Sequence, residues 1–233
     1  RPDEIERQRQ QYLDTLTVSL DEPSSIARFV GAKVLYGDGL YGHPVQGTLE
    51  SLKRISRADV LKMHRLFYRS DNAILVIGGD INSETGFTLA KRFFGDWPKP
   101  AARLPTTPTV NKPDSTTSGR VVVIDKPNAG QAAVYLVHRG IDRKDPDYYR
   151  GIVTNSVLNG YSGRLNQEIR IKRGLSYGAG SSLEGRRDVG PFVATAQTKN
   201  ESGPEVAGLL EKEVVRLSAL PPTESELTPR KAA

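Results

Sequence analysis

Residues 158–177 read LNGYSGRLNQEIRIKRGLSY, and this stretch decides how the second half of the chain folds. The pattern over 163–172 predicts a helix, with basic residues at its end where cations stabilise the negative pole of the helix dipole. Gly174 follows in the position of a C-terminal cap, because glycine adopts the left-handed conformation without strain. A strand over 175–183 is expected to leave this reversal.

The sequence around this stretch predicts further strands and helices. Strands are expected at 121–124, 132–138 and 191–198, and helices at 146–158 and 203–217. Another helix begins near Glu224. Strands and helices therefore alternate through the second half.

The first half is predicted to be mainly helical. Helices are expected from Asp3 to Leu16, from Glu22-Pro23-Ser24 to Gly37, and after a capping box formed by Ser56 and Asp59. Residues 73–79 (AILVIGG) show no polar alternation, so they predict a strand covered on both faces. A helix carrying Phe87, Ala90 and Phe94 is expected to follow.

A proline-rich segment separates the two halves. From Trp97 to Gly119 the sequence is rich in Pro, Thr, Ser and Lys without periodicity, which is typical of a linker. We therefore expect three parts: residues 1–97, a linker over 98–119, and residues 120–233.

The bulk composition is that of an ordinary globular protein. The chain has 233 residues, of which 37% are hydrophobic and 26% charged, and no apolar run is long enough to predict a membrane span. It contains no cysteine, which excludes disulfides and cysteine-based zinc sites. The net charge of +6 is spread among acids, so nucleic acid is not an expected partner. One local basic excess comprises Arg164, Arg170, Lys172, Arg173, Arg186 and Arg187 against Glu168 and Glu184, and it would attract acidic peptides unless it is simply a solvated surface.

Several segments, in order, resemble the pitrilysin/insulinase family of zinc metallopeptidases, which includes the mitochondrial processing peptidase and core proteins of a respiratory complex. They are residues 5–9 (IERQR), 41–44 (YGHP), 47–48 (GT), 51–60 (SLKRISRADV), 67–72 (FYRSDN), 94–97 (FGDW), 158–165 (LNGYSGRL) and 168–177 (EIRIKRGLSY). The resemblance implies an α+β fold in which mixed or antiparallel sheets are covered by helices. The chain would hold the latter part of one repeat and the opening part of the next.

The family's zinc site is an inverted H-x-x-E-H motif on a helix, completed by a distant glutamate. The three histidines here are His43, His64 and His138, and none lies within four residues of another. Glu6 falls near the position of the distant glutamate, but it also suits a solvated acid in a first helical turn. We therefore expect no metal site in this chain, and zinc only in the intact enzyme or in a partner subunit.

The resemblance also implies two substrate-facing residues. The family's second repeat carries an arginine and a tyrosine, seven residues apart, that hold the substrate backbone near the zinc, and Arg170 and Tyr177 match that pair. Both side chains can donate hydrogen bonds to a peptide carbonyl and to the oxyanion formed during hydrolysis. Otherwise they would be a solvated helix-end arginine and a core tyrosine.

Three accounts of function remain open. The chain is part of a single-chain zinc endopeptidase, or a subunit without zinc that holds substrate for a catalytic mate, or a non-enzymatic scaffold. The run Gln10-Gln11-Tyr12-Leu13-Asp14-Thr15 favours the second account, because catalytic members have a more apolar run ending in Glu. The expected partners are a peptide or protein substrate and either a zinc-binding subunit or a second copy of the chain. The chain alone is expected to be inactive.

Overall fold

The computed structural model describes residues 1–106 and 119–231, which form two compact units. The first unit contains residues 1–12 and the described part of 49–108, and the second contains 13–48 and the described part of 109–233. The helix α1 (Pro2–Asp21) contributes residues to both units. Residues 107–118 of the expected linker lie outside the described residues, and the division at 97 and 120 stays a prediction about sequence repeats.

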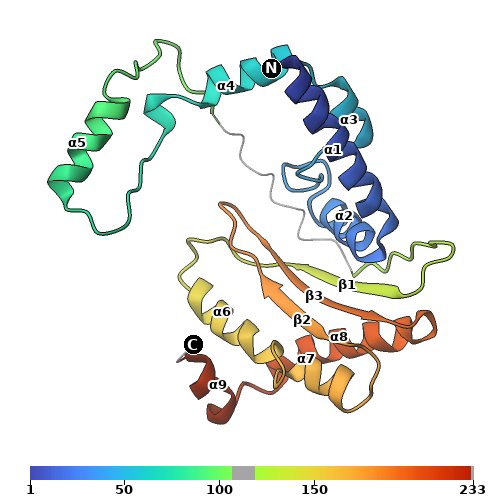
Figure 1. Cartoon of the computed structure of the whole chain (residues 1–233). Coiled ribbons are helices and arrows are strands. Elements are labelled where there is room, and N and C mark those ends of the chain that lie inside the picture. Colours follow the sequence, from blue (N-terminus) through green and yellow to red (C-terminus); the bar gives the residue numbers. More distant parts are fainter. Residues whose placement is uncertain (107–118, 232–233) are drawn as a thin grey trace. The chain divides into compact units, whose positions relative to one another are not determined.

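The second unit is built on a three-stranded antiparallel sheet (Figure 1). Its strands are β1 (Ala132–Arg139), β2 (Ala179–Leu183) and β3 (Pro191–Thr198), in the order β1-β3-β2. The central strand β3 pairs along its full length with β1, and five of its residues also pair with β2. The α+β fold with an antiparallel sheet covered by helices is confirmed.

Helices cover both faces of this sheet. One face carries α6 (Tyr148–Leu158), α7 (Arg164–Asn166), the π-helical turn η2 (Gln167–Ile171) and α8 (Gly203–Ala219). On the other face α2 (Pro23–Tyr36) packs against β1. Gly31 makes this approach close, because a Cβ atom there would lie 2.7 Å from the ring of Tyr135.

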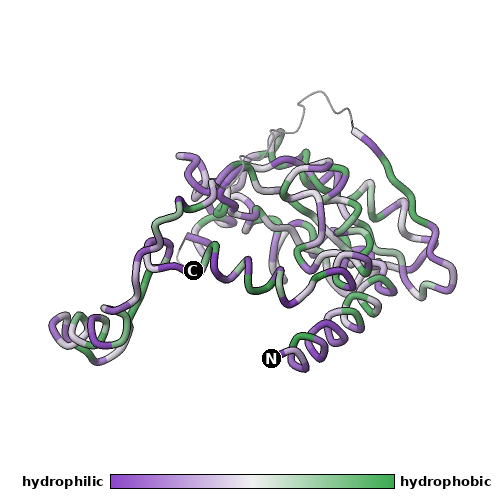
Figure 2. The backbone as a smooth tube through the Cα atoms, turned by 90° about the horizontal axis from the view of Figure 1, so that it is seen from above, coloured by the Kyte–Doolittle hydropathy of each residue, from purple (hydrophilic) through white to green (hydrophobic). Residues whose placement is uncertain are grey.

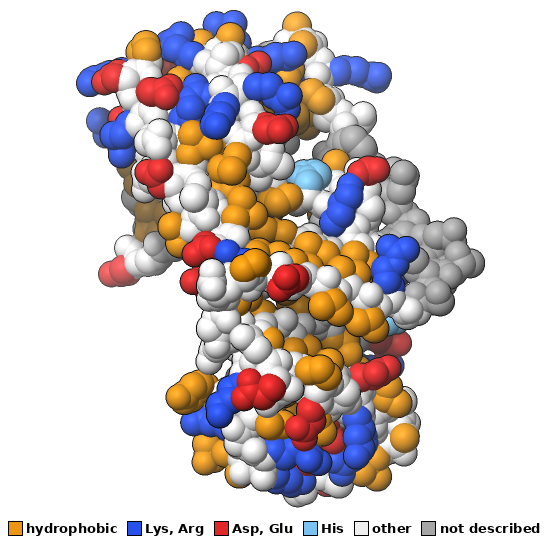
Figure 3. Space-filling view, turned by 90° about the vertical axis from the view of Figure 1, so that its right-hand side faces the viewer, with side chains coloured by type: hydrophobic (Ala, Val, Ile, Leu, Met, Phe, Trp, Pro, Cys, Tyr) orange, Lys and Arg blue, Asp and Glu red, His pale blue; other side chains and the backbone are white. Residues whose placement is uncertain are grey.

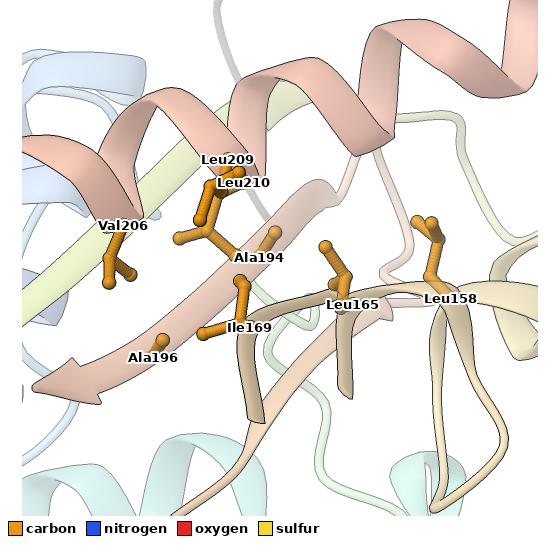
Figure 4. Close-up of a cluster of buried hydrophobic side chains, with 8 residues drawn as sticks. All are labelled: Leu158, Leu165, Ile169, Ala194, Ala196, Val206, Leu209 and Leu210. Carbon is orange, nitrogen blue, oxygen red and sulfur yellow. The ribbon is translucent and has the colours of Figure 1, made fainter. Parts of the chain in front are cut away.

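The core lies between β3 and the helices of the first face (Figure 4). Ala194 and Ala196 point from β3 toward α8, which supplies Val206, Leu209 and Leu210. Leu158, Leu165 and Ile169 close the cluster from α6, α7 and η2. The two small side chains on β3 leave room for the larger ones that face them, so the two layers pack closely.

The first half contains the helices that its sequence predicts. α2 begins after Glu22 and ends at Gly37, and α4 (Arg57–Phe67) has the expected capping box between Ser56 and Asp59. The Asn82 side chain caps α5 (Ser83–Phe94). The remaining elements are α3 (Leu49–Arg54), η1 (Ser70–Asn72), η3 (Asn200–Ser202) and α9 (Glu224–Lys231).

The helix α1 is hydrophilic over most of its surface. Figure 2 colours much of this N-terminal helix purple, and Leu16 is its only buried residue. Within the parts of the chain that the structure describes, no helix is long and apolar enough to cross a membrane.

Two predicted strands are wrong. Residues 73–79 and 121–124 form no ladder, and their apolar side chains are exposed, with Ile74 at 92% and Val121 at 90%. A strand needs a partner for its backbone groups, and the described residues offer neither segment one. The apolar sequence of these two segments suits the interior of a sheet. It does not show whether a neighbouring strand is present to pair with them.

Replacing a core leucine should destabilise the second unit. Leu210→Ala removes a fully buried side chain, so the free energy of unfolding should fall by about 2 to 5 kcal/mol. Leu220→Ala is the matched control, because this leucine is 48% exposed and should cost less than about 1 kcal/mol. Urea unfolding followed by circular dichroism measures both, and equal losses would contradict this assignment of the core.

A partly buried ion pair joins α9 to the start of α7. The Arg164 guanidinium donates two hydrogen bonds to the Glu226 carboxylate, at 2.8 and 2.9 Å, and a third to the Leu220 carbonyl at 3.1 Å. The Glu226 carboxylate also accepts the Thr223 amide at 2.9 Å. The hydrogen bonds from Arg164 and Thr223 lower the Glu226 pKa from 4.5 to about 2, although partial burial opposes them.

The contribution of this pair should depend on pH. The folded pKa of Glu226 lies below its unfolded value, so the stabilisation should be fully present above about pH 4.5 and lost as the pH falls toward 2. Glu226→Gln should lower the free energy of unfolding by about 1 to 3 kcal/mol at pH 6, because Arg164 loses a charged partner. Urea titrations of both proteins at pH 6 and pH 3 measure the difference, which should shrink at pH 3.

The control for this experiment is an exposed ion pair. Asp147→Asn breaks the pair with Arg150, whose side chain is 85% exposed, and should cost less than about 1 kcal/mol at pH 6. A Glu226→Gln difference that grows at pH 3 would contradict the prediction.

Candidate functional site

Arg170 lies on a π-helical turn that presents its side chain to solvent. The Lys172 amide donates to the Gln167 carbonyl at 3.0 Å, a five-residue spacing that widens the helix. Ile169 is fully buried in the core, while the adjacent Arg170 is exposed. The buried Ile169 side chain therefore fixes the backbone at the predicted site residue Arg170.

The chain reverses directly after this turn. Gly174 has a φ of +64°, its amide donates to the Arg170 carbonyl at 3.0 Å, and the Leu175 amide donates to the Ile169 carbonyl at 3.0 Å. The expected capping role of Gly174 is confirmed by this geometry. The Thr198 hydroxyl then donates to the Leu175 carbonyl at 2.6 Å, which ties the returning segment to β3.

Tyr177 follows this segment, two residues before β2, and it is 88% exposed. The Ser176 hydroxyl donates to the Gly178 carbonyl at 2.7 Å and accepts its amide at 3.1 Å, so a local turn surrounds the tyrosine. The alternative reading of Tyr177 as a core residue is wrong. Its phenol is accessible to a ligand.

The sequence reading missed Tyr161, which lies beside Arg170. The Arg170 guanidinium carbon is 5.8 Å from the centre of the Tyr161 ring, in the range of a cation–π contact, and Tyr161 is 69% exposed. The Tyr161 carbonyl accepts from the side-chain amides of Asn166 at 3.2 Å and Gln167 at 2.9 Å. An aromatic residue between two glycines, in a loop expected to be exposed, was the available signal.

Most basic side chains of this local cluster make ion pairs. Arg164 pairs with Glu226, Lys172 and Arg173 pair with Glu168, and Arg186 pairs with Glu184. Within the described part of the chain, Arg170 and Arg187 make no ion pair. On the face that Figure 3 shows, basic and acidic side chains lie among one another. The basic cluster is therefore mainly a paired surface, and Arg170 is one of its two cations that form no ion pair with another described residue.

The three histidines and Glu6 are scattered over separate elements. His43 lies in the turn after α2, His64 stacks on Tyr68 with ring centres 4.9 Å apart, and the His138 Nδ1 lies 2.7 Å from the Arg139 carbonyl oxygen. Glu6 forms an ion pair with Arg9 at 3.0 Å. Among residues 1–106 and 119–231, no three His, Asp or Glu side chains gather to hold a metal ion, so these residues do not fit a zinc site.

A separate hollow of about 550 Å³ lies in the second unit. It is lined by Asp21, Glu22, Pro23, residues 126–133 and Gln197. Asp21 and Lys126 form an ion pair in it, and neither Arg170 nor Tyr177 reaches it. The two predicted site residues are exposed and lie outside this hollow.

The chain matches a known protein family. The sequence pattern described as "Peptidase M16 inactive domain" matches residues 54–233. A protein of Streptomyces coelicolor described as an uncharacterized zinc protease is 26% identical over 194 residues, which are 82% of this chain and 42% of that protein. A probable mitochondrial-processing peptidase subunit beta of Schizosaccharomyces pombe is 27% identical over 178 residues, 74% of this chain and 37% of that protein.

A solved structure has a similar fold. The peptidase M16 inactive domain from Pseudomonas fluorescens superimposes with a TM-score of 0.88 at 27% identity, covering 100% of this chain and 55% of that one. This chain therefore spans about half the length of the relatives that it matches.

Substitution of Tyr177 should leave the fold intact. Because its side chain is 88% exposed, Tyr177→Ala should change the free energy of unfolding by no more than about 0.5 kcal/mol. Tyr148→Ala is the contrasting variant, since Tyr148 is only 9% exposed and should cost about 3 kcal/mol or more. Chemical unfolding measures both, and a large loss for Tyr177→Ala would show a packing role.

Proposed function

Because the chain belongs to the Peptidase M16 inactive domain family, we propose that it is the substrate-holding half or subunit of a zinc endopeptidase, and that it binds no zinc itself. The observation that carries the proposal is the exposure of Arg170 and Tyr177 on either side of the reversal at Gly174. Neither side chain is used in the core, and Arg170 forms no ion pair with another described residue. Both are available to a bound peptide.

The two side chains have complementary roles in this proposal. The guanidinium of Arg170 donates from a planar group that suits a peptide carbonyl, and the phenol of Tyr177 donates a single directed hydrogen bond. In the ground state these bonds hold the substrate backbone. As the carbonyl oxygen gains negative charge during hydrolysis the same bonds strengthen, which lowers the barrier.

The metal chemistry belongs to the other half. The described residues offer no ligand set, and the histidines lie on three separate elements. When bound by the zinc-carrying half or partner, zinc supplies the Lewis acid and the activated water of peptide hydrolysis. This chain then supplies donors and orientation. The family description, an inactive peptidase domain, supports this division of labour, and relatives named as zinc proteases support zinc in the intact enzyme.

The proposal predicts a specific kinetic defect. In the complete enzyme, Tyr177→Phe should lower the turnover of a peptide substrate about ten- to a thousandfold, because one donor to the developing oxyanion is lost. Arg170→Met should reduce kcat/KM by at least about tenfold. Turnover of a fluorogenic peptide by the assembly of this chain with its zinc-carrying half measures both effects.

Arg187→Met is the matched control for this experiment. Arg187 is another exposed arginine without an ion pair among the described residues, and it lies outside the Arg170 to Tyr177 reversal. It should leave turnover within about twofold. Unchanged turnover in Tyr177→Phe and Arg170→Met, with assembly intact, would instead indicate a scaffold.

A further inference from the structure

The outer edge of β2 is closed by a side chain. β2 is an edge strand, paired on one side with β3. The Glu184 amide donates to the Pro191 carbonyl at 3.0 Å, so even-numbered residues of this strand direct their backbone groups toward β3. Ser181 therefore directs its amide and carbonyl outward, where an edge strand ordinarily meets solvent or another chain.

The carboxamide of Asn159 bonds to both of these outward backbone groups of Ser181. The Ser181 amide donates to Asn159 Oδ1 at 2.6 Å, and Asn159 Nδ2 donates to the Ser181 carbonyl at 2.6 Å. The side chain thus pairs with β2 as the peptide group of a neighbouring strand would. Gly180 permits the approach, because a Cβ atom there would lie 3.2 Å from Asn159 Oδ1.

The backbone of Asn159 leads directly into the loop that carries Tyr161. Gly160 has a φ of +79°, and a side chain at Gly163 would collide with the Asn159 carbonyl at 2.1 Å, so the loop is folded tightly on itself. The Tyr161 carbonyl is fixed by two side-chain amides, and its ring lies against Arg170. The clamp at Ser181 therefore attaches β2 to the loop on which the Arg170 side chain rests.

These contacts close a circuit around the two substrate-facing residues. One path runs from Tyr177 through the first residues of β2 to Ser181, across the clamp to Asn159, and on through Tyr161 to Arg170. The other path is the reversal at Gly174. A clamp that fixes the first path restricts how far the phenol can move relative to the guanidinium, and small displacements of donors reduce catalysis strongly.

We propose that Asn159 is a positioning residue, which sets Tyr177 relative to Arg170 through its two hydrogen bonds to Ser181. This inference rests on the proposed function of the Arg170 and Tyr177 pair. The Asn159 side chain bonds to the backbone of Ser181 and Asn155 and to neither Arg170 nor Tyr177. Its effect on cleavage passes through the placement of Tyr177.

The test is a double-mutant cycle in the complete enzyme. Asn159→Ala should lower peptide turnover about tenfold, because the phenol is no longer held in place. In a Tyr177→Phe background the same substitution should lower turnover less than about twofold, since the donor that it positions is already absent. A merely structural role would give the same factor in both backgrounds, and that result would overturn the proposal.

Asn155→Ala is the matched control. Asn155 also contacts Ser181, donating to its carbonyl at 3.4 Å and accepting its hydroxyl at 2.7 Å, but it lies within α6 and not at the start of the loop. Its replacement should change turnover less than about threefold. Hydrogen–deuterium exchange of the Ser181 amide, followed by NMR in this chain, should accelerate at least about tenfold in Asn159→Ala and stay near the wild-type rate in Asn155→Ala.

The outcomes separate the two proposals. If Tyr177→Phe and Arg170→Met leave turnover unchanged, the proposed function fails, and the positioning role fails with it. If both lower turnover while Asn159→Ala has no effect, or has the same effect in both backgrounds, only the positioning role is overturned. An unchanged exchange rate at Ser181 in Asn159→Ala would show that the clamp does not exist in solution.

Discussion

The central strand β3 is the constraint on which the rest of the second unit depends. It is the only strand of the described sheet that is paired on both sides, so every backbone group of its middle residues is used in a ladder. Its side chains on one face are small where they meet α8, at Ala194 and Ala196. A larger residue at either position would displace α8 or the π-helical turn, and Arg170 would move with that turn.

Local patterns predicted most of the elements. The capping box at Ser56, the glycine at 174 and the strand at 191–198 were each predicted from nearby residues, and each prediction matches the structure. The strands predicted at 73–79 and 121–124 failed, because strand formation requires a pairing segment that no local pattern specifies. An apolar segment favours burial, but it forms a strand only where another strand lies beside it.

The sequence predicted two residues of the candidate site and missed a third, whose contacts lie far away in the sequence. Arg170 and Tyr177 were identified by resemblance, and their exposure agrees with contact with a ligand, although their role stays a proposal. Asn159 was not identified, because an Asn-Gly pair after a helix indicates only a turn. Its hydrogen bonds to Ser181 span 22 residues and depend on where β2 lies in the sheet. The sequence shows Asn159 and Ser181, but it does not show that the two residues lie side by side in the fold.

Ion pairs change how the basic cluster of residues 164–187 is interpreted. Counted along the sequence, residues 164–187 carry an excess of positive charge that would attract acidic peptides. In the structure Glu168 accepts from both Lys172 and Arg173, and Glu226 reaches Arg164 from a helix more than fifty residues away. Carboxylates thus lie beside four of the basic side chains, and Arg170 remains as a local donor.

A local donor suits the proposed role better than a broad positive field. A peptide carbonyl is neutral, so a diffuse charge would select acidic substrates without fixing any backbone. A guanidinium that lies on the Tyr161 ring, next to a residue anchored in the core, loses little conformational entropy on binding a carbonyl. On the π-helical turn Ile169 stays in the core, while the next residue, Arg170, faces solvent. The irregular turn thus connects core packing to the proposed recognition of a peptide backbone.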